Sequence, residues 1–140
     1  DVTMVLGHNV PNTTSTESVR NVVFDRAKGI CQGMIRVAPD AQKTDAKMAC
    51  NTLLMSDDGE FSAKPELEIF ADDVQCGHGA TVADISDTHL YYLMARGIPR
   101  AKARAMLVNA FVAEIVEELE DEHLVEALET IISNWLENHA

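Results

Sequence analysis

The sequence predicts a mixed β and α protein, with a strand-rich segment over residues 1–85 and a small α-helical domain over residues 86–140. Before residue 85, short runs of β-branched and apolar residues alternate with turn residues, and none keeps an extended 3.6-residue period. After residue 85, apolar residues recur at three- and four-residue spacing. A chain of 140 residues with 46% hydrophobic content is long enough to bury a core, as one domain or as two joined lobes.

Five runs of the first segment are typical of strands, because they are rich in β-branched and apolar residues or alternate between charged and aliphatic ones. These runs are residues 2–6, 19–24, 29–37, 50–55 and 66–69. Alternation within residues 29–37 places Cys31, Ile35 and Val37 on one face, so we expect Cys31 in the core. Short strands in succession suit a sandwich, a barrel or a solenoid, and no fixed internal period selects among them.

The connections between these strands are predicted from their turn residues. Segment 39–48 is polar and is interpreted as a connection with a helical turn. Segment 56–59, Ser-Asp-Asp-Gly, suits a tight turn. Pro65 is expected at the start of the last strand, where its missing N–H does least harm, with the acidic residues of 66–69 outward and the aliphatic ones inward.

Three helices are predicted in the second segment. The first begins after the N-cap residue Ser86 and ends at Gly97, a residue suited to a left-handed cap, and Pro99 starts the second. Apolar residues at helical spacing extend the predicted second helix over residues 107–119. The apolar stripe of the third helix comprises Leu124, Leu128, Ile131 and Trp135. Such stripes pack most often into a local core, although a bundle this small can leave one stripe for a partner.

Charge and composition exclude several classes of protein. The formal net charge of −12, from 23 acidic and 11 basic residues, disfavours nucleic acid as a partner, because Lys and Arg drive phosphate binding. The acidic residues between 114 and 122 are interpreted as a solvated helix end. No apolar run approaches the ~18 residues of a membrane span, so no membrane association is expected. The chain starts at Asp1 in a strand-like run, as a fragment would.

The cysteines predict a reducing compartment. Cys31, Cys50 and Cys76 are odd in number and far apart, which fits neither a disulfide framework nor a paired CxxC zinc site. The histidines at 8, 89, 123 and 139 have no Cys or His at ligand spacing and are interpreted as surface or capping residues.

Cys76 and His78 are the candidate site residues. No Walker loop, GxSxG elbow, HExxH or dinucleotide motif occurs, so no familiar class of enzyme is predicted. If a strand runs through them, Cys76 and His78 share a face about 7 Å apart along the strand. Thiolate and imidazole suit iron–sulfur or zinc chemistry, and Gly77 and Gly79 leave room for a second backbone or a ligand.

Two ligands do not close a four-coordinate site, so a functional site here needs a second chain. One alternative is a structural module in which Cys76 is packed and inert, since cysteine is among the most buried residue types. Another is a zinc enzyme that adds Asp72 or Asp73, although adjacent strand residues point to opposite faces and at most one carboxylate would face Cys76.

Three stretches resemble the SufD family of iron–sulfur cluster assembly proteins. Residues 64–82 read KPELEIFADDVQCGHGATV and are similar to the family pattern KPxLEI(Y/F)ADDVxCxHGATV. Residues 38–46 resemble the PDAQKTDA segment, and residues 92–98 resemble the YLxxRGI helix end. Gly77 stands where a serine is common, and Cys31 where an apolar residue is usual. The related SufB family lacks the motif cysteine, so Cys76 favours SufD, with a SufB-like paralogue as the alternative.

The resemblance implies a right-handed parallel β-helix for residues 1 to about 85, followed by a small α-helical domain. It further implies a non-enzymatic scaffold subunit of a SufBCD-type complex in the cytoplasm of a bacterium. In that complex the β-helix pairs with a SufB-like subunit and the helices bind the SufC-like ATPase; in isolation the fragment could form a homodimer. Cys76 and His78 would then contribute to a transient iron–sulfur cluster at the intersubunit interface, and no tightly bound cofactor is expected in the fragment alone.

Overall fold

The chain forms two compact units, Asp1–Val82 and Ala83–Ala140, each described here by itself. The computed structural model describes residues 1–117 and 119–139, with side chains described up to residue 136. In this part of the chain the strands are β1 (Val2–His8), β2 (Thr14–Val23), β3 (Lys28–Val37), β4 (Asp45–Leu54), β5 (Glu60–Ile69) and β6 (Gln75–Asp84). The helices are α1 (Asp87–Ala95), α2 (Arg100–Ala113) and α3 (Glu122–His139).

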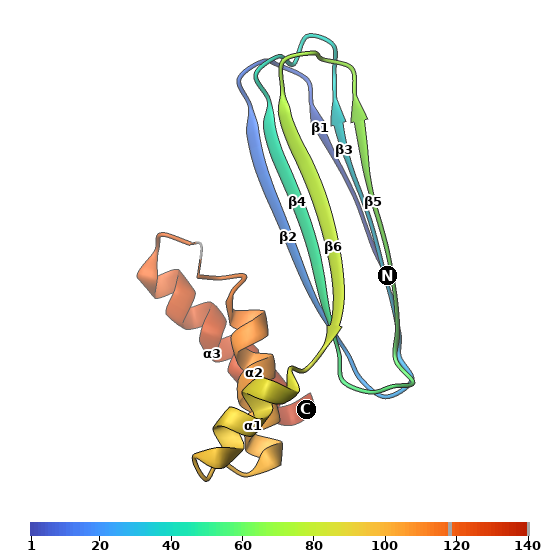
Figure 1. Ribbon diagram of the computed structural model, residues 1–140. Helices are drawn as coiled ribbons and strands as arrows, with labels where there is room; N and C mark the ends of the chain where they lie inside the picture. Colours follow the sequence, from blue (N-terminus) through green and yellow to red (C-terminus); the bar gives the residue numbers. More distant parts are fainter. Residues whose placement is uncertain (118, 140) are drawn as a thin grey trace. The chain divides into compact units, whose positions relative to one another are not determined.

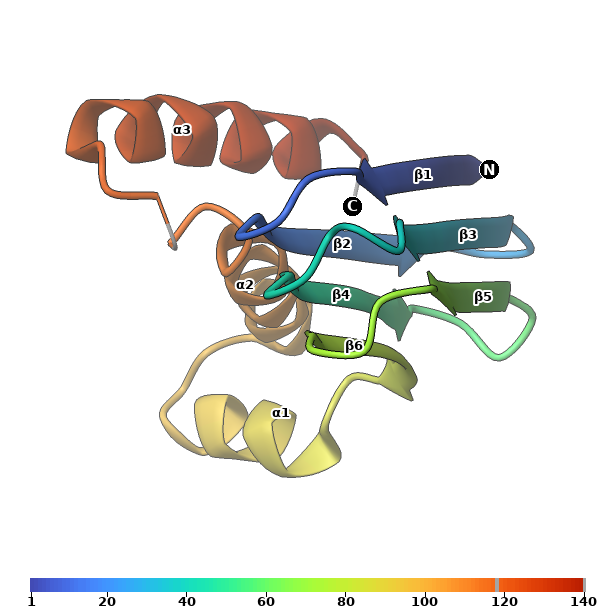
Figure 2. The same ribbon diagram turned by 90° about the horizontal axis from the view of Figure 1, so that it is seen from above.

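The strands form two three-stranded parallel sheets, in the orders β1-β3-β5 and β2-β4-β6. Consecutive strands therefore alternate between the sheets, and each strand pairs with the next but one (Figure 1). The view from above shows the same two groups of strands (Figure 2). The mixed β and α architecture predicted from the sequence is confirmed, whereas the β-helix and the domain division at residue 85 stay predictions.

Alternating side chains of both sheets build the core of the strand unit. Ile35 and Val37 of β3 are fully buried, and Ala46 and Met48 of β4 pack against them. Cys31 is 3% exposed, so its predicted core position is confirmed. These inward residues alternate with exposed ones along β3, as the period of two requires.

The prediction for segment 39–48 is wrong in its second half. Residues 45–48 belong to β4, and Thr44, Ala46 and Met48 are all at most 4% exposed. The strand was missed because Asp, Ala and Lys have low β-propensity. Alternation of small apolar residues with polar ones, rather than β-branched content, is the signal that this strand carries.

The predicted position of Pro65 is also wrong. β5 begins at Glu60, so Pro65 lies inside the strand, paired in register with Gly33 of β3. Proline is tolerated there because β5 is an edge strand of its sheet. Leu67 packs against the core as expected, but Ile69 is 39% exposed.

The helical unit begins as predicted. The Ser86 side chain accepts a hydrogen bond from the backbone N–H of His89, and α1 ends before Gly97, whose φ of +85° is the left-handed conformation that glycine favours. Pro99 is the N-cap of α2. α2 ends earlier than predicted, at Ala113, and residues 114–117 form a turn.

The predicted apolar stripe of α3 packs only at Leu128, which is half-buried. Its other members, Leu124, Ile131 and Trp135, are 47%, 63% and 52% exposed. The neighbouring residues Val125 and Leu136 are half-buried and buried. The sequence is ambiguous here because two neighbouring stripes of α3, shifted by one residue, are both apolar. No helix in the described part of the chain is long and apolar enough to cross a membrane.

Candidate functional site

Cys76 and His78 lie near the start of β6, the strand that the sequence predicted to pass through them. β6 is an edge strand of its sheet, next to β4, and hydrogen bonds from Gln75 and Thr81 join it to residues in and just before β4. The Gln75 N–H donates to the Thr44 carbonyl (2.8 Å), and the Thr81 hydroxyl donates to Asn51 Oδ1 (2.7 Å).

The two candidate ligands differ in burial. Cys76 is half-buried and packs, beside Val74, against the core cluster that includes Ala46. His78, two residues further along the same face, is exposed. The strand therefore presents one ligand at the boundary of the core and one in solvent.

Burial raises the pKa of the Cys76 thiol, and the carboxylate of Asp45 acts in the same direction. A backbone hydrogen bond from Ala46 lowers this pKa and offsets part of the effect. Since the thiolate is the metal ligand and nucleophile, Cys76 in this chain alone is a protonated, weakly reactive thiol at neutral pH.

The two glycines of the motif face open space. A Cβ atom added to Gly77 or Gly79 would meet no atom within 4 Å. Both residues lie on the face of β6 opposite Cys76 and His78, because alternate strand residues point to opposite faces. This part of β6 thus has a bare backbone surface that another chain could approach closely.

The edge of β6 also lacks charge. From Gln75 to Ala83 the strand contains no Asp, Glu, Lys or Arg, although charged residues are the usual protection of an edge strand. The edge strand β5 is protected in this way: Glu60 pairs with Lys28 (2.7 Å) and Glu68 with Arg36 (2.9 Å). The two edges are built differently, and the unprotected one carries Cys76 and His78.

The neighbouring aspartates do not complete a site. Asp72 and Asp73 lie in the bend before β6 rather than on the strand, and the Asp73 carboxylate pairs with Lys43. Within the part of the chain that is described, no three His, Cys, Asp or Glu side chains come together as a metal site would require.

His8 contradicts its interpretation as a surface or capping residue. It is 5% exposed, and its ring nitrogens hydrogen-bond Thr13 Oγ1 (2.7 Å) and Ser15 Oγ (3.0 Å). Close by, a buried carboxylate oxygen of Glu17 has no hydrogen-bond partner among the described atoms, and burial raises the pKa of this carboxyl group while His8 lowers it. The alternation along β1 that ends on His8 is the signal that could have found this polar cluster.

The other histidines behave as expected where they are described. His89 and His123 are exposed in the first turns of α1 and α3, where their backbone N–H groups donate to Ser86 and Asp121. The side chain of His139 lies outside the described side chains.

The fold and the site define a mixed β and α protein with two alternating parallel sheets and a Cys-x-His pair on an open edge strand. The family model described as "SUF system FeS cluster assembly, SufBD core domain" matches residues 1–111, and the chain belongs to this family. The resemblance to SufD seen in the sequence motifs is thereby confirmed.

Individual relatives agree with this assignment. The chain is 44% identical over 119 residues to the iron-sulfur cluster assembly protein SufD of Escherichia coli, covering 85% of this chain and 28% of that protein. It is 32% identical over 117 residues to an iron-sulfur cluster assembly SufBD family protein of Synechocystis, covering 84% and 25%. It is 36% identical over 96 residues to the chloroplastic protein ABCI7 of Arabidopsis thaliana, covering 69% and 20%. The chain thus spans about a quarter of the length of these relatives.

Proposed function

We propose that this chain is a scaffold segment for iron–sulfur cluster assembly, without enzymatic chemistry of its own, that pairs with a SufB-like subunit through the edge of β6. The observation that carries the proposal is the placement of Cys76 and His78 on an exposed, uncharged edge strand. The similarity to SufD and SufBD family proteins, whose names state a role in cluster assembly, supports it.

Edge pairing follows from the backbone of β6. About half of the N–H and C=O groups of this ten-residue strand point away from β4, where a second strand can satisfy them. Each hydrogen bond contributes about 0.5–1.5 kcal/mol net, so several of them together make a substantial interface. The bare face at Gly77 and Gly79 lets the partner's backbone also pack across the strand. A second copy of this chain offers the same edge, so two copies could pair as a homodimer in isolation.

The cluster is the cargo of this site, and the chain supplies part of its coordination. Cys76 and His78 provide a sulfur and a nitrogen ligand, and the remaining ligands come from the partner strand. Because metal binding must displace the thiol proton, the raised pKa of Cys76 weakens its hold on iron. Weak coordination suits a site that builds a cluster and then releases it.

The strand unit is proposed to form the last turns of a right-handed parallel β-helix. Its support is the alternation of consecutive strands between two parallel sheets, with every strand paired to the next but one. In such a coil the strands that follow one another share a continuous core, so the open edge of β6 would be the end of the coil in this chain.

The helical unit is proposed to bind the SufC-like ATPase through its exposed apolar side chains. Among the described side chains, seven large apolar residues lie exposed on the three helices: Tyr91, Tyr92, Met94, Met106, Leu124, Ile131 and Trp135. Exposed aromatic and methionine side chains of this kind are enriched in protein interfaces. No nucleotide-binding motif occurs in the chain, so ATP turnover would belong to the partner.

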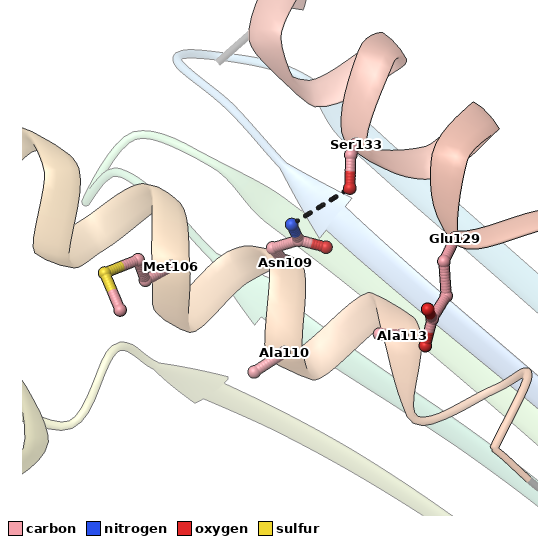
Figure 3. Close-up of a pocket in the computed structure, with 6 residues that line it drawn as sticks. All are labelled: Met106, Asn109, Ala110, Ala113, Glu129 and Ser133. Atoms are coloured by element: carbon pink, nitrogen blue, oxygen red, sulfur yellow. Dashed lines mark hydrogen bonds between the residues drawn. The ribbon is translucent and has the colours of Figure 1, made fainter. Parts of the chain in front are cut away.

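The helical unit also contains a groove between α2 and α3 that could take part in this binding. Figure 3 shows its lining residues on the two helices, with Asn109 Nδ2 donating to Ser133 Oγ (3.2 Å). The groove has a volume of about 340 Å³, and its lining comprises Met106, Asn109, Ala110, Ala113, Glu129 and Ser133. Its floor of small and apolar residues with one carboxylate at Glu129 suits an apolar or cationic side chain of the partner.

A purely structural pairing module is the second candidate. The half-buried position of Cys76, and the burial that raises its pKa, favour a packed and inert thiol. In that case the edge of β6 would still pair with a partner, and Cys76 and His78 would make no contact with iron or sulfur.

Separate Cys76→Ala and His78→Ala substitutions distinguish the two candidates. The full-length protein is expressed with candidate SufB and SufC chains, and co-purification and the iron–sulfur chromophore are measured. Under the scaffold proposal the complex stays intact and the chromophore is lost in both variants, while His89→Ala, at an exposed histidine of α1, keeps it. Full cluster formation in both variants, with the complex intact, would establish the structural module instead.

A further inference from the structure

Three turns at one end of the strand unit are joined to one another by hydrogen bonds. They link β1 to β2, β3 to β4 and β5 to β6, and they lie side by side in Figure 1. The Asn12 N–H donates to the Gln42 carbonyl (2.9 Å), and the Lys43 N–H donates to the Asp73 carbonyl (2.6 Å). The last of these turns leads directly into β6, so the contacts made by this turn decide where the strand that carries Cys76 begins.

Asp73 is held through all three of its polar groups. Its backbone N–H donates to Gln42 Oε1 (2.9 Å), its carbonyl accepts from the Lys43 N–H, and its carboxylate pairs with the Lys43 ammonium group. The Gln42 side chain is itself fixed, because its Nε2 donates to the Pro39 carbonyl (3.0 Å). The bend before β6 is therefore fastened to residues 42 and 43.

Lys43 adopts a backbone conformation that lysine disfavours. Its φ of +63° lies in the left-handed region, which residues other than Gly, Asn and Asp seldom occupy. In the turn between β1 and β2 the left-handed residue is Asn12, with a φ of +60°, and asparagine tolerates this conformation. A lysine in the same conformation indicates a role for its side chain, and the contact that this side chain makes is the ion pair with Asp73.

The fastened bend also sets the position of Cys76. Between Asp73 and Cys76, the N–H of Gln75 donates to the Thr44 carbonyl (2.8 Å), and Cys76 then packs, half-buried, against the core cluster. β6 has a neighbouring strand on one side only, so its first residues depend on these contacts. We propose that Lys43 is a positioning residue for Cys76: its ion pair with Asp73 keeps the start of β6, and hence the thiol, in one place against the core.

The ion pair is too exposed to add much to overall stability. The Lys43 and Asp73 side chains are 63% and 64% exposed, and exposed pairs contribute little to the free energy of folding. Its effect is therefore local, as resistance to opening of the first residues of β6. Ligands of a shared site must be held to within about 0.5 Å. The consequence for cluster assembly rests on the function proposed for Cys76, whereas the position of the thiol does not.

Alkylation of Cys76 tests the position of the thiol. The full-length protein that contains this chain is treated with iodoacetamide at one fixed pH, and the reaction of each cysteine is followed by mass spectrometry of its peptide. Lys43→Asn keeps a residue type suited to positive φ and removes the ion pair, so we expect Cys76 to react about 2- to 5-fold faster. Cys31 and Cys50, which are 3% and 2% exposed, should react as slowly as in the wild type.

Two further variants serve as controls for the side chain of Lys43. Lys43→Arg can still pair with Asp73 and should restore the wild-type rate. Lys28→Ala removes another exposed ion pair, with Glu60 at the opposite end of β3, and should leave the rate at Cys76 unchanged.

A double variant identifies the pair itself. If Lys43 acts through Asp73, Asp73→Ala raises the alkylation rate by a similar factor, and the double variant Lys43→Asn, Asp73→Ala raises it no further. An unchanged rate in Lys43→Asn, or two effects that multiply in the double variant, would overturn the proposal. So would equal acceleration at Cys31, because that result would show a general loosening of the fold rather than opening at β6.

Cluster formation with candidate SufB and SufC chains separates this proposal from the function proposed above. Lys43→Asn should keep co-purification and lower the iron–sulfur chromophore about 2- to 5-fold, following the release of Cys76. Lys28→Ala should keep the full chromophore. Faster alkylation of Cys76 together with a full chromophore in Lys43→Asn would overturn the role of Lys43 in assembly. Full cluster formation in Cys76→Ala would instead overturn the function proposed for the thiol, and the alkylation result would still decide the role of Lys43 in its position.

Discussion

Gly79→Val is expected to stabilise the isolated chain and to weaken its binding to a partner, so it tests the two properties independently. In the structure, a Cβ at Gly79 meets nothing within 4 Å, so the larger side chain has room in the isolated chain. Glycine inside a strand is about 0.5–1 kcal/mol less favourable than a residue with a side chain, and valine is a favoured strand residue. We therefore expect the free energy of unfolding of the isolated chain to rise by about 0.5–1 kcal/mol.

The same substitution should weaken binding of the SufB-like partner. If the partner's backbone packs over the bare face of β6, the valine at position 79 is inserted into a filled interface. Overpacking of this kind costs about 1–3 kcal/mol. The dissociation constant is then expected to increase about 5- to 150-fold.

Two measurements on the same variant provide the assay: urea unfolding of the chain and titration calorimetry with the purified partner. Ser18→Val is the matched control, because Ser18 is exposed on β2 of the same sheet and β4 separates it from β6. Unchanged affinity in Gly79→Val would refute the proposed use of this face. A lower free energy of unfolding in the isolated variant would refute the inference that a side chain at position 79 has room.

Two further predictions concern other parts of the molecule. Burial raises the pKa of Glu17, so the folded state keeps its proton to higher pH than the unfolded chain and stability is lost as the pH rises above 4.5. Glu17→Gln should therefore increase the free energy of unfolding at about pH 7 and change it little below about pH 4; an equal effect at both pH values in urea unfolding would contradict this. Trp135→Ala should lower the free energy of unfolding by only about 1 kcal/mol, because the side chain is 52% exposed. It should weaken ATPase binding about 30-fold or more if Trp135 is an interface hot spot, and unchanged affinity would exclude Trp135 from the interface.

The sequence predicts strands well where β-branched residues dominate and poorly elsewhere. β3 was predicted to within one residue of its bounds. The first halves of β2, β4 and β5 were missed because they consist mostly of Thr, Ser, Ala, Lys, Asp and Glu. These halves are strands because their neighbours in the sheet supply hydrogen-bond partners, and that information is non-local. Proline at position 65 misled the prediction for the same reason, since its tolerance depends on β5 being an edge strand.

The regular pairing of the strands could not be detected as a sequence repeat, because paired strands are unequally spaced along the chain. Val2 pairs with Cys31, Thr14 with Asp45 and Lys28 with Glu60, so paired strands follow one another at intervals of 29, 31 and 32 residues. A search for a fixed period fails on such a chain, although the pairing itself is regular. The motif in residues 64–82 identified the family where periodicity could not.

The placement of Cys76 and His78 on one strand was predictable from the sequence, but the burial and electrostatics of Cys76 were not. Alternation places Cys76 and His78 on one face, which the strand β6 confirms. The packing of Cys76 against the core and the resulting rise in its pKa depend on residues 30 positions earlier in the chain, around Ala46. For His8, the last residue of β1, the predicted surface position failed because the polar partners Thr13 and Ser15 come from the following turn and strand.

A protonated Cys76 thiol on the open edge of β6 is consistent with a site that binds its cargo only transiently. On this chain alone Cys76 is neutral and weakly reactive, so the exposed edge does not bind stray metal tightly or react with other thiols. A partner strand that brings a positive charge or iron close to Cys76 would favour the thiolate and lower its pKa. The thiol would then become a ligand only while the two chains are paired, and separation of the chains would restore its proton and release the cargo.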